Sequence, residues 1–189
     1  MNATNLNIFK SLLQGNERFI NDTPAHPKQN SERRKEISEA QYPIATVLTC
    51  SDSRITPELI FDVGLGELFV IRVAGNIIDD SVMGSIEYSV EHLKVSLVIV
   101  QGHQDCGAVK AAIYSINEKG SIPGILKSIK IPADQNDDIV HQTMINNVNN
   151  VVRELKNSEP ILKKYADIGK LDIIGTYYDL ESGKVEKIE

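Results

Sequence analysis

The 189-residue chain contains only two cysteines, no tryptophan and no long apolar run. Two cysteines are too few for the disulfide framework of a small secreted domain, so we expect both to remain thiols in a reducing compartment. The apolar run at residues 95–100 is short, whereas a bilayer span needs about 18 apolar residues, which excludes membrane insertion. Residues 1–19 lack an apolar core followed by a small-residue cleavage site, which predicts no secretory signal or transit peptide and a cytoplasmic protein.

The chain also lacks an excess of basic residues. It has 20 lysines and arginines against 26 aspartates and glutamates, and a formal net charge of -6. Binding to phosphates needs clustered basic side chains that displace counterions, so nucleic-acid binding is not expected. The hydrophobic fraction of 41% suits a compact fold with a real core. We predict a single domain over residues 1–189, with an N-terminal helix and arm over residues 1–30.

Hydrophobic periodicity predicts alternating helices and strands. Apolar residues at helical spacing predict helices over residues 5–20, 80–94, 108–116, 139–156 and 160–165. The polar composition predicts a charged helical turn over residues 31–40 and a short helix with a loop over residues 121–138. Runs rich in β-branched residues predict strands over residues 44–48, 68–73, 97–100, 171–178 and 185–188. The expected fold is α/β, with a mainly parallel sheet of four strands, an antiparallel edge strand, and helices on both faces.

Two sets of polar side chains follow strands of this predicted sheet. Cys50, Asp52 and Arg54 alternate directly after the first strand, so their side chains share one face of an extended chain. His103 and Cys106 come just past the third strand, and the carboxyl ends of neighbouring parallel strands meet at one edge. Two thiolates and an imidazole favour Zn²⁺ and leave a fourth position for water, the ligand count of a catalytic site. The alternative is two buried apolar thiols and a core histidine.

The charged side chains beside Cys50 indicate how such a site would act. Zinc lowers the pKa of its water, so that hydroxide is available near neutral pH as a nucleophile. Asp52 can accept a hydrogen bond from that water, and Arg54 can hold the carboxylate bidentately and keep it ionised. Gly107 then allows a close approach before the next helix. The pair Asp52 and Arg54 would therefore control what reaches the metal.

Several longer motifs resemble the β-class carbonic anhydrases. They are CSDSR at residues 50–54, PELIFDVGLGELFVIRVAGN at residues 57–76, EYSVEHL at residues 87–93 and GHQDCGAVKAA at residues 102–112. The resemblance begins with LLQGNERF at residues 12–19 and extends to YDLESGKVE at residues 178–186, so it covers nearly the whole chain. It implies the reversible hydration of carbon dioxide to bicarbonate and a proton.

The resemblance also implies roles for single residues. Cys50, His103 and Cys106 match the ligands of one zinc ion per chain, and Asp52 and Arg54 match the family's dyad. The substrate pocket of the family matches Gln41, Phe69, Ala74, Tyr88 and Gly107. Ala74 stands where plant-type members have valine, which should slightly widen the pocket. His92 matches a histidine proposed as a proton shuttle in plant-type members; a solvent-facing helix histidine without a catalytic task is the alternative.

The resemblance also implies an oligomeric state and whether the active site is open or closed. Family members are at least dimeric, so we expect a homodimer or homotetramer with the active site at the subunit boundary. The N-terminal helix is expected to pack on a partner subunit, with Leu12, Leu13 and Phe19 buried there. Members with a closed site carry a tryptophan in an inhibitory bicarbonate pocket, and this chain has none. An open, plant-type site is therefore expected.

Two other functions fit parts of the same pattern. Relatives with the same metal ligands hydrolyse carbon disulfide or carbonyl sulfide, whose linear, apolar molecules resemble carbon dioxide. A non-catalytic protein with a structural zinc ion is the second alternative. A structural site is normally closed by four protein ligands and does not need an Asp-Arg pair, which favours an enzyme.

Overall fold

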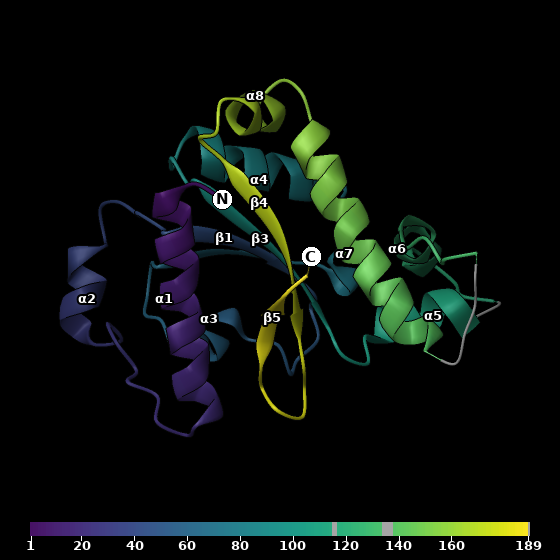
Figure 1. Ribbon diagram of the computed structural model, residues 1–189, viewed down its shortest axis with the longest axis horizontal. Helices are drawn as coiled ribbons and strands as arrows, with labels where there is room; N and C mark the ends of the chain where they lie inside the picture. The colour runs from purple at the N-terminus through teal and green to yellow at the C-terminus, as the bar shows by residue number, and fades with distance from the viewer. Residues whose placement is uncertain (115–116, 134–137, 189) are drawn as a thin grey trace.

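A five-stranded sheet forms the centre of the molecule. The computed structural model of the chain describes residues 1–114, 117–133 and 138–188. The strand order is β2-β1-β3-β4-β5 (Figure 1). The strands are β1 (Ala45–Thr49), β2 (Leu68–Arg72), β3 (Leu97–His103), β4 (Asp172–Tyr178) and β5 (Val185–Lys187). The first four are parallel and β5 is antiparallel to β4, which confirms the predicted arrangement of strands.

Helices cover both faces of the sheet, as predicted. They are α1 (Ala3–Ile20), α2 (Ser31–Glu36), α3 (Pro57–Ile60), the 3₁₀ turn η1 (Ala74–Asn76), α4 (Asp80–Glu91), α5 (Gly107–Tyr114), α6 (Ile122–Ser128), α7 (Ile139–Asn157) and α8 (Leu162–Asp167). Figure 1 shows α1 on one side of the sheet and α7 on the other. Positions 115–116 and 134–137 of the predicted elements lie outside the described residues. No described helix is both long and apolar enough to cross a bilayer.

The helix predicted over residues 80–94 is shorter in the structure. It starts at the expected place because the side chain of Asp79 accepts a hydrogen bond from the backbone N–H of Val82 at 2.8 Å and so caps the first turn. It ends at Glu91, and Lys94 adopts a left-handed backbone conformation with φ of 61°. A left-handed residue stops the helical path, although the apolar spacing continues to Leu93.

Two apolar layers enclose the sheet. Side chains alternate along β1, so Val47 joins the layer under α1 and α3, and Leu48 joins the layer under α4 and α7. Members of the first layer include Phe9, Leu12, Ile60 and Phe61, and members of the second include Ile86, Val148, Val151 and Leu155. Each fully buried side chain of this size stabilises the fold by about 1.5–3 kcal/mol. The sheet is thereby fixed from both sides.

Buried hydrogen bonds near both ends of α1 connect this helix to β4, to β5 and to the turn between them. Near the start, the Asn5 amide donates a hydrogen bond to the carboxylate of Asp172 at 2.8 Å. Near the end, the Asn16 amide donates to the carbonyl of Gly183 at 2.7 Å and accepts from the backbone N–H of Val185 at 2.8 Å. Both asparagines are buried. The first helix is therefore tied to the last strands of the same chain.

The apolar face of α1 lies on the same chain's sheet. Leu12 is only 1% exposed within one chain, so the expectation that it needs a partner subunit for its burial is wrong. Leu13 and Phe19 are partly buried against the same apolar layer. Their remaining surface is what a partner subunit would cover, and packing of α1 on a partner stays a prediction.

A buried carboxylate holds the end of α1 and the arm that follows it. Asp62 accepts hydrogen bonds from Arg18 Nε at 2.5 Å and from the backbone N–H groups of Ala25 and His26 at 2.9 and 3.0 Å. Burial opposes ionisation of Asp62, but these N–H groups and the Arg18 guanidinium outweigh it and hold the pKa of the carboxyl below its ordinary value. Asp62 is therefore charged in the folded protein at neutral pH.

Asp62→Asn is expected to lower the free energy of unfolding by about 2 kcal/mol at pH 7, because the amide cannot replace charged hydrogen bonds at all three donors. A carboxyl whose pKa is lower in the folded state adds stability above its unfolded pKa of about 3.9, and that stability is lost as the pH falls through the folded value. The difference between wild type and variant should therefore shrink below about pH 4. Urea unfolding at pH 7 and pH 3 measures both effects.

The control is Asp167→Asn, which removes a carboxylate paired with Lys163 on the surface. Surface pairs contribute little, so this variant should unfold almost as wild type does at either pH. Equal losses of stability for the two variants would show that the burial of Asp62 is irrelevant.

Candidate metal centre

Three side chains from two neighbouring strand ends meet at the carboxyl edge of the sheet. Cys50 follows β1, His103 ends β3, and Cys106 lies just before α5. Their ligand atoms all lie within 4.8 Å of one another, and the two sulfurs are 3.9 Å apart. All three residues are buried. Because β1 and β3 pair in parallel with Thr49 opposite Gln101, the sequence prediction that these residues converge is confirmed.

The imidazole of His103 is oriented as a ligand. Its Nδ1 lies 2.8 Å from the backbone carbonyl of Gln104, and a carbonyl can only accept, so Nδ1 carries the proton. Nε2 is then left with a lone pair. This atom is buried and has no hydrogen-bond partner in the described part of the chain. A buried lone pair beside two sulfurs is the arrangement that a metal ion completes.

The two thiols do not ionise independently. The hydrogen bond from the Cys106 thiol, with help from the N–H of Gly75, lowers the pKa of Cys50 despite its burial. The pKa of Cys106 is raised, because its thiol donates to Cys50, is buried, and faces the charge of that thiolate. A divalent cation bound between the two sulfurs would offset the repulsion between two thiolates and allow both thiols to ionise. The donor set therefore fits Zn²⁺ chemically.

A glycine brings the backbone close to one sulfur. Gly75 has a φ of 72°, in the left-handed region that favours glycine, and its N–H donates to Cys50 Sγ at 3.3 Å. An N–H aimed at a thiolate stabilises its charge. The η1 turn thus contributes to the electrostatics of the centre.

Asp52 and Arg54 form the predicted pair beside Cys50. Arg54 Nε and Nη2 donate to the two carboxylate oxygens of Asp52 at 2.9 and 2.7 Å, and the Arg54 backbone N–H donates to the same carboxylate at 3.0 Å. These bonds hold the pKa of Asp52 well below its usual range, and Asp52 in turn raises the pKa of Arg54. The carboxylate is therefore ionised and fixed in direction.

Arg72, to which the sequence pattern assigned no role, also contacts this segment. Its guanidinium donates to the backbone carbonyls of Cys50 and Asp52 at 3.2 and 2.7 Å. The available signal was a charged side chain at the end of an otherwise apolar strand. A charge in that position suggests solvent exposure as readily as a role.

The five predicted pocket residues fall into two groups. Ala74 and Gly107 are next to residues of the centre, since Gly75 bonds Cys50 and Gly107 follows Cys106. Phe69 and Tyr88 contact each other elsewhere, with ring centroids 6.3 Å apart.

The second group lies away from the metal centre of the same chain. Phe69 pairs with Thr46, four residues before Cys50, which corresponds to about 13 Å along the strand. Gln41 precedes β1 and is therefore also at the amino end of the strand. One chain thus does not bring all five residues to one pocket.

His92, the predicted proton shuttle, lies beside Tyr88 and therefore near the second group of pocket residues. Its ring lies 5.0 Å from that of Tyr88, one helical turn earlier, at the end of α4. It has no described contact with Cys50, His103 or Cys106. A proton-shuttle role for His92 stays a prediction.

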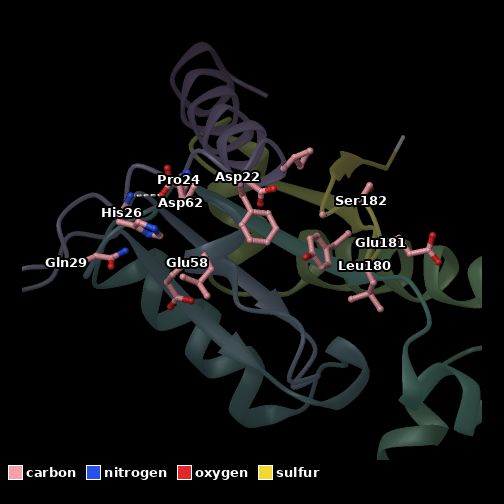
Figure 2. A pocket seen from close by; sticks show the side chains of 14 residues that line it. Asp22, Pro24, His26, Gln29, Glu58, Asp62, Leu180, Glu181 and Ser182 are labelled. Carbon is pink, nitrogen blue, oxygen red and sulfur yellow. Dashed lines mark hydrogen bonds between the residues drawn. The ribbon is translucent and has the colours of Figure 1, made fainter.

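A cavity of about 490 Å³ lies outside the metal centre, among the end of α1, the arm, α3 and the turn before β5 (Figure 2). Asp22, Glu58 and Glu181 are among its lining residues, and Figure 2 shows Glu181 turned away from the others. The group formed by Cys50, His103 and Cys106 is the one set of potential metal ligands in the described ranges, and none of the three lines this cavity. We assign the cavity no part in the chemistry.

Comparisons with known proteins agree on one family. The family model described as carbonic anhydrase matches residues 45–185. The carbonic anhydrase of Mycolicibacterium smegmatis is 39% identical over 194 residues, which cover 98% of this chain and 94% of the relative. The family model covers β1 to β4 and the three residues Cys50, His103 and Cys106.

Solved structures share the fold. The β-carbonic anhydrase of Coccomyxa, solved with acetazolamide, has a TM-score of 0.76 at 27% identity and covers 94% of this chain and 84% of its own. A structure from a study of two tetrameric β-carbonic anhydrases of Sordaria macrospora has a TM-score of 0.77 at 24% identity and covers 96% and 97%. The architecture is therefore shared over almost the entire chain.

Proposed function

The chain belongs to the β-carbonic anhydrase family, and from this premise we propose that it hydrates carbon dioxide reversibly with one zinc ion held by Cys50, His103 and Cys106. That the protein is an enzyme, a carbonic anhydrase, follows from its relatives. The observation that carries the zinc proposal is the buried group of two sulfurs and an unpaired imidazole nitrogen. Three protein ligands, rather than four, leave one position for reaction and argue against a purely structural metal.

The residues around the centre have separate tasks. Zinc, when bound, supplies a nucleophile near neutral pH by lowering the pKa of water. Asp52 would accept a hydrogen bond from water entering the site and so orient it toward carbon dioxide. Arg54 would keep Asp52 ionised and prevent the carboxylate from turning onto the metal. Ala74 and Gly107 would leave room for the substrate.

The rest of the substrate pocket would come from a second copy of the chain. Gln41, Phe69 and Tyr88 lie away from their own metal centre, and Tyr88 is 46% exposed despite its aromatic ring. The strand β2 pairs only with β1 among the described strands, so its outer edge is available for contact. The tetrameric state of the Sordaria enzymes makes such assemblies available to this fold. A homodimer or homotetramer would then complete each site.

Mixing two impaired variants tests this composite site. Asp52→Asn removes the carboxylate of one group, and the double variant Gln41→Ala with Tyr88→Ala removes side chains of the other. After dissociation and reassociation, random mixed dimers carry one intact site each, and we expect about a quarter of wild-type activity. A stopped-flow hydration assay before and after mixing measures the recovery. Activity that stays at the mean of the two variants would place both groups in one subunit.

Zinc content and hydration rate together test the proposed function. We expect one zinc per chain and a hydration rate that rises with pH as water ionises at the site. Assays with carbonyl sulfide and carbon disulfide on the same sample separate the hydrolase alternative. A folded, metal-free protein that hydrates carbon dioxide at full rate would overturn the zinc proposal.

A further inference from the structure

The segment that carries Cys50 and Asp52 has left the sheet. The strand β1 ends at Thr49, so the backbone carbonyls that follow need donors from elsewhere. Arg72 supplies two of them, with Nε 3.2 Å from the carbonyl oxygen of Cys50 and Nη2 2.7 Å from that of Asp52. The Asp52 carbonyl also accepts from the N–H of Ile55 at 3.0 Å. One guanidinium therefore connects the residue that bears a sulfur ligand to the residue that bears the carboxylate.

Arg72 acts from a rigid position. It is the last residue of β2 and stands opposite Thr49 in the parallel register. The next residue, Val73, donates its N–H to the carbonyl of Thr49 at 3.1 Å, and Gly75 donates to Cys50 Sγ at 3.3 Å. The end of β2 and the η1 turn thus hold Cys50 by three hydrogen bonds. They go to the carbonyl of the preceding residue, to the carbonyl of Cys50 and to its sulfur.

We propose that Arg72 is a positioning residue for the metal centre, which sets the directions of Cys50 Sγ and the Asp52 carboxylate relative to each other. The planar guanidinium offers two N–H groups in a fixed fork, so it fixes two carbonyls at one separation, which a lysine ammonium on a flexible stem does not. Arg72 itself is exposed. This inference rests on the proposed zinc site.

The test compares zinc retention in wild type, Arg72→Lys and Arg72→Met. Loss of a group that orients metal ligands typically costs about 10- to 100-fold in metal affinity or activity. We expect Arg72→Met to release zinc to a competing chelator about tenfold faster than wild type, with Arg72→Lys between them. The visible absorption of the cobalt-substituted protein should also change in Arg72→Met, because it reports the geometry at the ligands. Both measurements are made well below the unfolding temperature of each variant.

The matched control is Arg33→Met. Arg33 also donates its Nε to a loop carbonyl, that of Leu65, at 3.0 Å, but no described contact joins it to the metal ligands. This variant should retain zinc and the cobalt spectrum of wild type. If wild type binds zinc and Arg72→Met retains it equally well with an unchanged cobalt spectrum, the inference about Arg72 is wrong. If wild type itself binds no zinc, the proposed function fails instead.

Discussion

Replacing Cys106 with serine is expected to abolish zinc binding and to reduce carbon dioxide hydration by about three orders of magnitude or more, because the metal contributes several kcal/mol to lowering the barrier. Serine keeps the size of the side chain but supplies a hydroxyl that does not ionise at neutral pH. The remaining sulfur and imidazole leave an incomplete site. Metal analysis and a stopped-flow assay on the purified variant measure both losses.

Ser53→Ala, an exposed change in the segment after Cys50, serves as the control and should keep full zinc content. Cys106 is buried, so replacing it also changes the packing around the site. Removing the metal from the wild-type protein with a chelator tests the role of the metal without changing a side chain. Activity should disappear and return on addition of zinc. A chelated, demonstrably zinc-free protein that still hydrates carbon dioxide would exclude a catalytic metal here.

Asp52→Asn is expected to lower kcat by about 100-fold while the protein keeps one zinc per chain, since a residue that orients a group at a metal centre typically contributes about 10- to 100-fold to activity. The amide accepts hydrogen bonds less strongly than the carboxylate and is free to turn its NH₂ group toward the water. Arg54 would lose its charged partner as well. The effect should therefore be on turnover, measured by kcat at saturating carbon dioxide, with metal content assayed in parallel.

Asp105→Asn controls for the removal of a negative charge near the centre. Asp105 lies between His103 and Cys106 in sequence, its carboxylate pairs with Lys110 at 2.9 Å, and its φ of 55° is one that asparagine tolerates well. This variant should keep most of the activity. If both variants lose activity equally, the effect of Asp52 is one of overall charge and not of hydrogen bonding.

Local patterns were sufficient to predict which side chains gather at the candidate metal centre, and the resemblance to a family then implied that they are zinc ligands. Cys50 and His103 each stand at the end of an apolar, β-branched run, and parallel strands bring such ends to one edge of the sheet. The Asp52–Arg54 pair was predictable for the same reason, because residues two apart in extended chain share a face. These inferences needed only the strand pattern and the chemistry of the side chains.

Contacts between distant segments could not be read from the sequence. The bonds of Arg72 depend on the register of β2 against β1, and a shift of one residue would have turned its side chain to the other face. The separation of Phe69 from Cys50 depends on the same register. The short helix α3 (Pro57–Ile60) was missed because four residues contain too little of the helical period to be recognised.

The hydrogen bonds that connect α1 to the last two strands have a consequence for synthesis on the ribosome. This helix is translated well before the partners of its buried amides, at Asp172, Gly183 and Val185, which lie 167 to 169 residues later in the chain. Contacts so far apart in the chain form slowly because the loop between them must close first. Until residues 172–185 have been translated, the buried amides of Asn5 and Asn16 therefore lack these partners. A molecule truncated before residue 172 would keep the apolar contacts of α1 with β1, α3 and β3 but would leave the two amides without these hydrogen bonds.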